Sequence, residues 1–318
     1  MTARTRIPVH LGSLALIMLS TACAAPAPAA DAGHRIASVA DDGTASTPIR
    51  WTPSAWSTDQ YESSPTFSPD GREAYLMRAD ARFRGYRLLW SRCVAGHWTV
   101  PEDVPFAAPA PILEGDPALS PDGRRLYYIS TRHAHPGDDF DIWVVERGTD
   151  GAWGQPRRLP EPVNSSGAEL LPRPGPGGVL YFGSSRAGGY GQSDIYMAEP
   201  LASDGGGERW TVRNVGPPVS TAANEYEADV SRDGRTLVVV ADRGDRSHLY
   251  RFVRQGERWV EVGRTPGRPD VFQVGPLLSP RADRLLFAQA DGERSGELFV
   301  VDLASDADRS WPPRCAAS

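Results

Sequence analysis

Lysine is absent from this sequence: all 34 basic residues are arginine, and 40 acidic residues leave a formal net charge of −6. Abundant alanine, glycine, proline and arginine are typical of proteins encoded by GC-rich genomes, so the absence of lysine carries no functional weight. The sequence also has no basic block. Because nucleic-acid binding depends on positive charge that faces the phosphates, the composition argues against a nucleic-acid partner.

Long hydrophobic runs are missing as well. The apolar stretch from Leu11 to Leu19 is too short to span a bilayer. It follows Arg4 and Arg6 and precedes small residues, which is the pattern of a secretory signal peptide. We therefore expect residues 1–22 to be an export signal and no other segment to cross a membrane.

The small residues at 20–22 precede Cys23, and together they resemble a bacterial lipobox. The resemblance implies that Cys23 is lipidated and becomes the mature N-terminus, although Ser20 stands where the family prefers leucine. The alternative is an ordinary cleavage site followed by an incidental cysteine. With Ala24 after the cysteine, the resemblance implies a location at the periplasmic face of the outer membrane, held there by the lipid alone. Residues 23–48 are expected to be a flexible tether.

Catalytic sequence motifs are also missing. There is no Gly-x-Ser-x-Gly motif, no glycine-rich phosphate loop and no His-Glu-x-x-His motif. The six histidines are scattered along the chain. We therefore assign no catalytic residue, although a site assembled from several repeats would not be visible as a motif.

What the sequence does contain is an internal repeat. Its signature is a Ser-Pro-Asp-Gly-Arg turn or a worn copy of it, and the copies begin at Ser68, Ser120, Pro174, Ser231 and Ser279. The spacings are 52, 54, 57 and 48 residues. Asp-Gly favours a tight hairpin because glycine accepts a positive φ and aspartate can bond the turn backbone.

Short runs of β-branched and aromatic residues follow each turn, as expected for strands. One strand comes directly after the turn in each copy: 74–77, 126–129, 179–182, 237–240 and 285–288. A further strand follows in each: 88–90, 141–145, 194–197, 249–252 and 298–301. Another begins near Trp98, Trp153, Trp210 and Trp259. Four strands in about 50 residues is the size of one β-propeller blade.

The turn motif and the stretch from Ser184 to Tyr196 resemble the TolB-type, WD-like propeller repeat, over roughly residues 50–303. The resemblance implies an all-β fold, a single propeller of four-stranded blades, and a periplasmic binding or scaffolding role. The commonest blade number in the family is six, but only five copies can be counted here, so five blades are favoured and six are the alternative.

Ring closure in a propeller usually borrows a strand from the other terminus. Residues 49–51 lie where such a strand would begin, and pairing with residues 298–301 would complete the last blade. We therefore expect the propeller to span residues 49–303, followed by a C-terminal tail at 304–318. This tail is too short to hold the separate hydrolase domain of peptidases that carry similar propellers.

Acidic or amide residues recur six positions before the turns, at the start of the strand expected to line the channel. These residues are Glu62, Glu114, Glu169 (beside Ala168), Glu225 and Gln273, and they predict a ring at one mouth of the channel. Such a ring could hold a divalent cation or a basic ligand. The alternative is pairing with arginines that end the next strand, Arg132, Arg186 and Arg243.

Only three cysteines are present, and if Cys23 carries lipid, Cys93 and Cys315 remain. Cys93 lies in the first blade and Cys315 lies just beyond the last one, and these blades are neighbours in a closed ring. The exported compartment is oxidising. We therefore expect a disulfide that attaches the tail across the closure.

These features favour a non-catalytic binding or scaffold protein of the cell envelope, with a protein, peptide or cell-envelope component as its partner. No cofactor is expected, except that a divalent cation at the acidic ring remains open. The alternative function is a carbohydrate-active, lyase-like enzyme with a metal-assisted site in the channel. Convergence of histidine and acidic residues from different blades would favour the enzyme.

Overall fold

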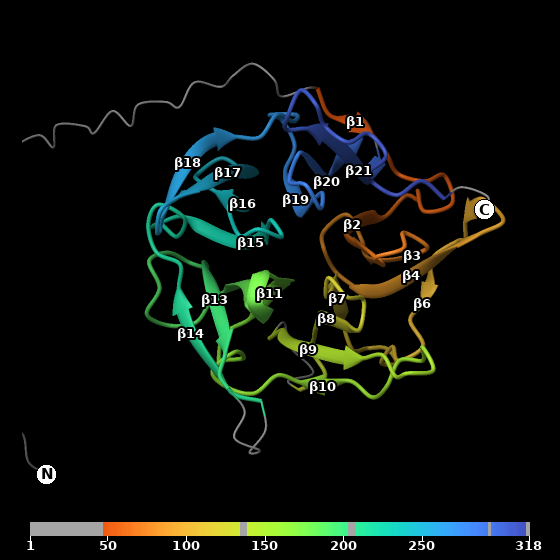
Figure 1. Cartoon of the computed structure of the whole chain (residues 1–318), viewed down its shortest axis with the longest axis horizontal. Coiled ribbons are helices and arrows are strands. Elements are labelled where there is room, and N and C mark those ends of the chain that lie inside the picture. Colours follow the sequence, from red (N-terminus) through yellow and green to blue (C-terminus); the bar gives the residue numbers. More distant parts are fainter. Residues whose placement is uncertain (1–46, 134–138, 203–207, 292–293, 316–318) are drawn as a thin grey trace, which may run out of the picture. The chain divides into compact units, whose positions relative to one another are not determined.

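The computed structural model describes residues 47–133, 139–202, 208–291 and 294–315, and these are built almost entirely of antiparallel β-strands. The strands form five blades arranged around a central axis (Figure 1). The predicted all-β propeller is thereby confirmed, with five blades rather than six. The signal peptide, Cys23 and nearly all of the tether lie outside the described residues. Within the described ranges, no helix has the length and apolar character of a membrane span.

Each blade begins with its innermost strand and continues outward. Blade one contains β2 to β6: Tyr61–Phe67, Glu73–Ala79, Arg87–Val94, His97–Trp98 and Glu102–Asp103. Blade two contains β7 to β10: Glu114–Leu119, Arg125–Ser130, Asp141–Glu146 and Arg157–Arg158. Blade three contains β11 to β14: Glu169–Pro174, Leu180–Ser184, Asp194–Pro200 and Trp210–Asn214. Blade four contains β15 to β18: Asn224–Val230, Thr236–Asp242, Ser247–Gln255 and Arg258–Arg264. Blade five contains β19 to β21 and, from the other end of the chain, β1: Gln273–Leu278, Arg284–Asp291, Arg294–Asp302 and Ile49–Arg50.

The repeated turn joins the two innermost strands of a blade. In the first copy, the Ser68 hydroxyl accepts the N–H of Glu73 and donates to the Asp70 carboxylate, while Gly71 takes a φ of 67°. The same contacts recur around Ser120 and Ser231. Serine and aspartate therefore fix the turn through side-chain bonds to its own backbone, as the repeat predicts.

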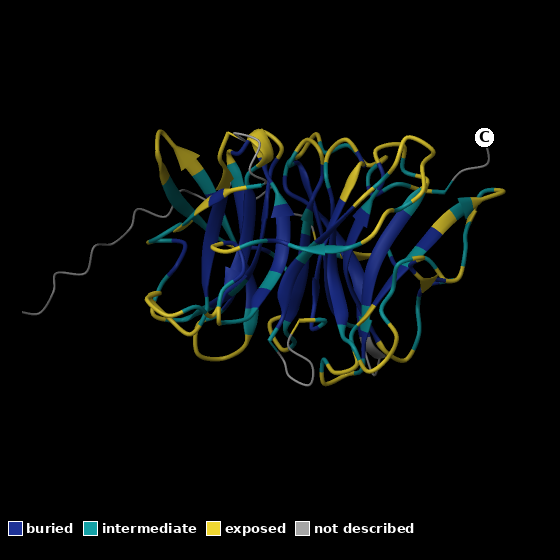
Figure 2. Ribbon diagram, turned by 90° about the horizontal axis from the view of Figure 1, so that it is seen from below, coloured by how far each residue is buried: buried dark blue, intermediate teal, exposed yellow. Residues whose placement is uncertain are grey.

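The hydrophobic core lies between neighbouring blades. One cluster joins Tyr181 and Ile195 of blade three to Leu237 and Phe252 of blade four, and equivalent clusters fill the other interfaces. Figure 2 shows the buried residues concentrated in the strands and the exposed residues in the loops at the two faces. Because each blade buries its aromatic strands against the next blade, the ring is the folding unit.

The ring closes through a strand borrowed from the N-terminal side, as predicted. In this closure β1 pairs antiparallel with β21, with Ile49 opposite Val300 and Arg50 opposite Phe299. The Thr52 hydroxyl also accepts the N–H of Leu298, at 2.7 Å. The borrowed strand thus covers the edge of the last blade, which would otherwise carry unpaired backbone groups.

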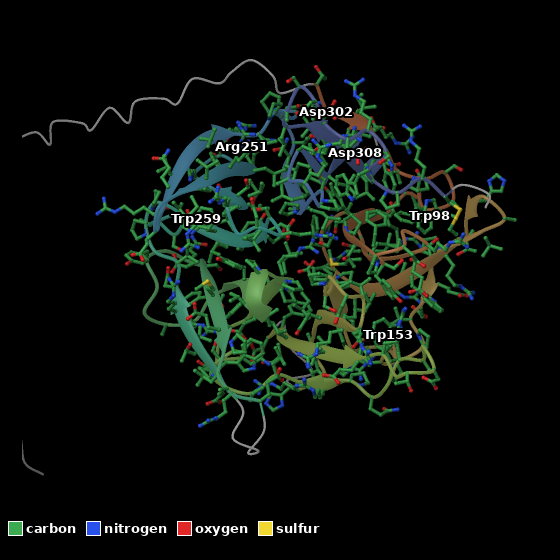
Figure 3. All side chains as sticks on the ribbon, in the orientation of Figure 1. Trp98, Trp153, Arg251, Trp259, Asp302 and Asp308 are labelled. Carbon is green, nitrogen blue, oxygen red and sulfur yellow. A yellow bond between two sulfur atoms is a disulfide. The ribbon has the colours of Figure 1, made fainter. Side chains whose placement is uncertain are left out.

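The C-terminal tail is attached across this closure. A disulfide joins Cys93 of blade one to Cys315, the pair expected from the sequence (Figure 3). The Arg284 guanidinium also donates to the backbone carbonyl of Trp311. The first and last blades are therefore linked by a strand and by a covalent bond.

The turns provide a test of the repeat. Ala282 occupies the glycine position of the worn copy with a φ of 55°, where side chains other than glycine are strained. Ala282→Gly should raise the free energy of unfolding by about 0.5–1 kcal/mol. Gly123→Ala, which brings a Cβ to 2.8 Å from Pro69 at a φ of 70°, should lower it by about 1–2 kcal/mol. Urea unfolding midpoints measure both changes. A destabilising effect of Ala282→Gly would contradict the assignment of Ala282 to the glycine position of the turn.

The disulfide provides a second test. Replacing Cys93 and Cys315 together with serine should lower the free energy of unfolding by about 2–4 kcal/mol, since the bond restricts the unfolded chain across 222 residues. The unsubstituted protein with a reducing agent should unfold at the same urea concentration as the double variant. An unfolding midpoint that does not change on reduction would show that the tail adds nothing to closure.

Candidate functional site

The predicted acidic ring exists, but its side chains are buried among the blades and their connecting loops. Glu62, Glu169, Glu225 and Gln273 have no exposed surface, and Glu114 is 3% exposed. The backbone N–H groups at the ring positions of blades two, three and four donate to the preceding blade, to carbonyls of Tyr86, Phe140 and Ser193. At these three positions the ring residue therefore lies where two blades meet.

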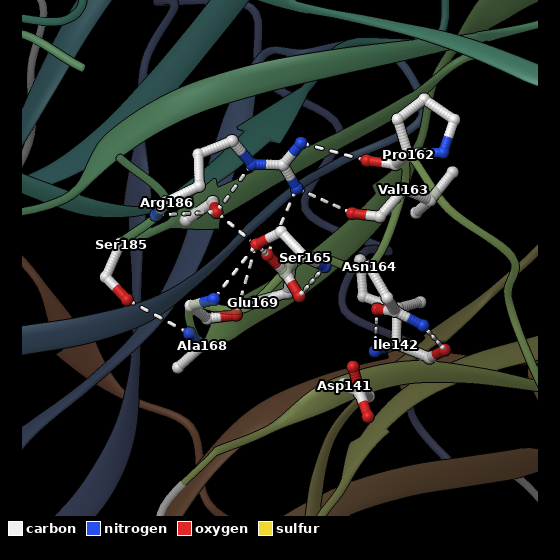
Figure 4. A network of polar contacts seen from close by, with 12 residues as sticks. Asp141, Ile142, Pro162, Val163, Asn164, Ser165, Ala168, Glu169, Ser185 and Arg186 are labelled. Atoms are coloured by element: carbon white, nitrogen blue, oxygen red, sulfur yellow. Dashed lines mark hydrogen bonds and ion pairs between the residues drawn. The ribbon is translucent and has the colours of Figure 1, made fainter. Parts of the chain in front are cut away.

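In three blades the ring carboxylate is paired with an arginine. Glu62 pairs with Arg78 and Glu114 with Arg132, both at 2.8 Å, and Glu169 pairs with Arg186 at 3.0 Å. Each of these arginines also donates to a carbonyl of the connecting loop: Trp56, Phe106, and both Pro162 and Val163. Figure 4 shows the third of these networks around Glu169 and Arg186.

The other two ring positions are bonded differently. Glu225 accepts the backbone N–H and the hydroxyl of Thr221, and the Gln273 amide donates to Gln289. Arg243, expected to pair with the ring, instead pairs with Glu261 at 2.9 Å. The ring carboxylates are therefore bonded to arginines and connecting loops, and none of the ring residues lines the pocket described below.

Side chains enter the channel from bulges in the innermost strands. The register of every innermost strand shifts once, and Ser64, Asp116, Leu171 and Gly275 have positive φ angles at these bulges. Asp116 accepts the Ser64 hydroxyl and the backbone N–H of Leu171, and Glu227 accepts the N–H of Gly275. Two channel carboxylates thus connect neighbouring blades. The innermost strands β7 and β15 pair with the second strands of their own blades, so these connections between blades come from side chains.

Arg173 extends across the channel. This side chain is 2% exposed and donates to the carbonyls of Pro117 in blade two and Pro276 in blade five. Its Nε lies 3.8 Å from a carboxylate oxygen of Asp229 in blade four. One guanidinium from blade three therefore contacts three other blades near the middle of the channel.

A pocket of about 390 Å³ opens beside this network, on the face opposite the Ser-Pro-Asp-Gly turns. Asp116 and Glu227 line its buried end, and exposed Asp245 and Arg246 stand at its rim. The aromatic residues in its walls are Phe83, Tyr86, Tyr226 and Phe272. We call this cavity the channel pocket. It combines apolar walls with a few convergent polar groups, the composition typical of small-ligand sites.

The pocket carboxyls are held in an environment that disfavours their charge. Burial and the neighbouring charge of Asp116 raise the pKa of Glu227 to about 8. Burial also raises the pKa of Asp116, against the opposing effects of Ser64 and Arg173. At neutral pH the pair therefore retains at least one proton, because two buried carboxylates close together resist full ionisation.

The sequence prediction missed this pocket. Four positions before the first residue of each turn, the copies contain Ser64, Asp116, Leu170, Glu227 and Gly275. Two copies have an acid at this place, Asp116 and Glu227, whereas the other copies have small or apolar residues. This difference could have indicated the pocket. The position that is acidic in most copies instead belongs to the blade repeat itself, where its side chains bond arginines and connecting loops.

Metal binding was left open by the sequence. Among the residues that the structure describes, no group of three histidine, cysteine, aspartate or glutamate side chains lies close enough to hold a metal ion. The acidic residues of different blades converge at the channel pocket, and His248 contacts Asp245 at its rim, with 3.4 Å between Nε2 and a carboxylate oxygen, without lining the pocket itself. Among the described residues, the pocket lining contains acidic side chains and no histidine.

No family model and no curated protein matches this chain. Among solved structures, it resembles Zg3597, a family 117 glycoside hydrolase from Zobellia galactanivorans, with 15% identity over 83% of this chain and 92% of that one, and a TM-score of 0.55. TolB from Acinetobacter baumannii shares 16% identity over 78% of this chain and 56% of that one, with a TM-score of 0.48. A periplasmic gluconolactonase from Pseudomonas aeruginosa shares 16% identity over 80% and 81%, with a TM-score of 0.44. A likeness at this level of identity shows the fold alone and does not assign a function.

The raised pKa values predict how stability depends on pH. Between the ordinary value of 4.5 and about 8, the folded protein holds a proton at Glu227 that the unfolded chain releases, so the free energy of unfolding should fall as the pH rises across this range. In Glu227→Gln the fall should be smaller, because the contribution of Glu227 is removed. It should not vanish, because burial also raises the pKa values of Glu62 and Glu169. Urea unfolding at pH 5, 6.5 and 8 measures the slope.

The matched control is Glu225→Gln, a buried glutamate in the same strand that does not line the channel pocket. A slope identical in Glu227→Gln and the unsubstituted protein would contradict the assignment.

Proposed function

We propose that this protein is a non-catalytic binding protein of the bacterial cell envelope, whose channel pocket receives part of a protein, peptide or cell-envelope ligand. One observation carries the proposal: a preformed pocket of about 390 Å³ with aromatic walls and two buried carboxyls at its end. Because the walls come from several blades of a closed ring, the pocket exists without a ligand. Little conformational freedom is then lost on binding.

The proposal places the protein at the periplasmic face of the outer membrane, exported by residues 1–22 and anchored by a lipid on Cys23. The formal charge of −6, which becomes −8 once Arg4 and Arg6 are removed, favours partners that carry positive charge. The proposed function requires no cofactor. Repeating the binding measurements in EDTA tests whether binding depends on a divalent cation, which the sequence left open.

A second candidate function, a carbohydrate-active enzyme, is favoured by one observation. Carboxyls from blades two and four line the same pocket, and the pKa of Glu227 is raised to about 8, a value suited to a general acid at neutral pH. Turnover of glycans or nitrophenyl glycosides would establish this function in place of the first, provided that Glu227→Gln abolishes turnover and Glu225→Gln retains it.

The proposed binding function predicts the position of photo-crosslinks in cells. A photo-crosslinking phenylalanine analogue at position 246, on the pocket rim, should form adducts with envelope proteins after irradiation. The same analogue in place of Val94, which is 55% exposed at the end of β4, should form none. Mass spectrometry of the adducts identifies the partner. Adducts at position 94 alone, or at neither position, would argue against the channel pocket as the binding site.

A further inference from the structure

The channel pocket holds more negative than positive charge. Asp116 and Glu227 line the pocket. They belong to a channel network in which three buried carboxyls, Asp116, Glu227 and Asp229, lie around the buried guanidinium of Arg173, and of these Asp229 and Arg173 line the channel on the side of the turns. On the rim, Asp242 and Asp245 outnumber Arg246, whose guanidinium donates to the carbonyl of Asp270. Buried charges in proteins are normally paired or neutralised. The site therefore carries an excess of negative charge, which a proton on the Asp116–Glu227 pair reduces.

Two polar groups flank the aromatic walls, the Glu227 carboxylate and the Tyr61 hydroxyl. The Oε2 atom of Glu227 accepts the N–H of Gly275 at 2.7 Å. The Tyr61 side chain is 1% exposed, and its hydroxyl has no partner among the described residues. Burial and the charge of Glu227 both raise the pKa of Tyr61. The Glu227 carboxylate lines the pocket and can accept N–H bonds from a bound ligand.

The walls present aromatic rings to the same space. Tyr61 packs on Phe83 and on Phe272, with ring centroids 4.6 and 5.3 Å apart, and Tyr226 lies beside Glu227 in the sequence and in the wall. The π faces of aromatic rings attract cations, most strongly where water is excluded. A neutral sugar could stack on such walls, but it would leave the charge imbalance unchanged. A basic side chain would use the rings and the carboxylates together.

We propose that the channel pocket binds an organic cation, the ammonium or guanidinium group of a basic ligand, with Glu227 as its principal counter-ion. The proposal deepens the binding function given above and rests on it. The volume of about 390 Å³ admits a basic side chain with its aliphatic stem. Arg173 stays in place as the structural cation of the channel, and the ligand supplies the second positive charge.

Cation binding in this pocket is an exchange with a proton. Asp116 from β7 and Arg173 from β11 act on the pKa of Glu227, and Glu227 in turn raises the pKa values of Tyr61 from β2 and Tyr226 from its own strand. The other charged groups of the pocket are Asp242, Asp245 and Arg246. Below about pH 8 the carboxyl pair must lose its proton to become the counter-ion of the ligand. Affinity should therefore rise with pH by up to about tenfold per unit in this range, because one proton is released for each cation bound.

The test compares two ligands of nearly the same shape by calorimetry on the exported full chain in detergent. N-acetyl-arginine amide should bind, and N-acetyl-citrulline amide, in which the guanidinium is replaced by a neutral urea, should bind at least about tenfold more weakly. N-acetyl-lysine amide distinguishes an ammonium from a guanidinium preference. Titrations at pH 6, 7 and 8 in phosphate and in Tris should show tighter binding at higher pH and release of nearly one proton at pH 7.

Variants locate the counter-ion. Glu227→Gln should weaken arginine-amide binding at least about tenfold and remove most of the pH dependence. Glu225→Gln should retain both properties. If Glu227→Gln fails to fold, the citrulline comparison and the pH dependence of the unsubstituted protein still decide the question.

Equal affinity for the arginine and citrulline amides, pH-independent binding, or full affinity in Glu227→Gln would each overturn the proposal. No binding of either basic amide, combined with envelope adducts at position 246, would overturn the cation preference and leave the binding function standing. If neither amide binding nor adducts at position 246 were found, the cation preference and the binding function would both be overturned.

Discussion

Closure of the ring is the constraint on which the rest of this structure depends. Blade five has three strands of its own, and its outer edge is covered only because β1 returns from the other end of the chain to pair with β21. The first and last blades also share a large hydrophobic cluster, which includes Trp56, Phe287 and Phe299. The channel pocket takes its residues from blades one, two, three, four and five, so it exists only while the ring is closed.

Repeated and unrepeated residues have different tasks in this propeller. The ring glutamates recur from blade to blade, because in each blade the loop that leads into it must be attached. Glu114 and Glu169 meet this need with the same arginine pairing. The channel residues break the repeat, with Asp116, Arg173 and Glu227 each present in one copy. A ligand with its own shape needs such asymmetry, so the unrepeated positions carry the functional hypothesis.

The channel charges also contribute to the architecture. Asp116, Glu227 and Asp229 each accept a backbone N–H from an adjacent blade, which supplies bonds that the innermost strands do not make through regular pairing. Arg173 adds two bonds to carbonyls of other blades. Removing one member would leave buried charge unpaired, which is costly. The same groups that hold the blades together therefore create the negative pocket, and the part of their charge that Arg173 leaves unbalanced is available to a ligand.

Local sequence patterns were enough to predict the blade and the closure and to favour five blades over six. Turn chemistry and strand alternation are local, so Ser68 to Gly71 specifies a hairpin wherever it occurs, and the spacing of the copies specifies the ring. The segment at 49–51 and the pair Cys93 and Cys315 followed from the topology of a closed ring. The position of the channel pocket follows only from the tertiary structure. The bulges direct Asp116, Arg173 and Glu227 into one channel from three blades, although these residues are far apart in the chain. Their meeting depends on the curvature of the whole ring and on burial, which no local pattern encodes.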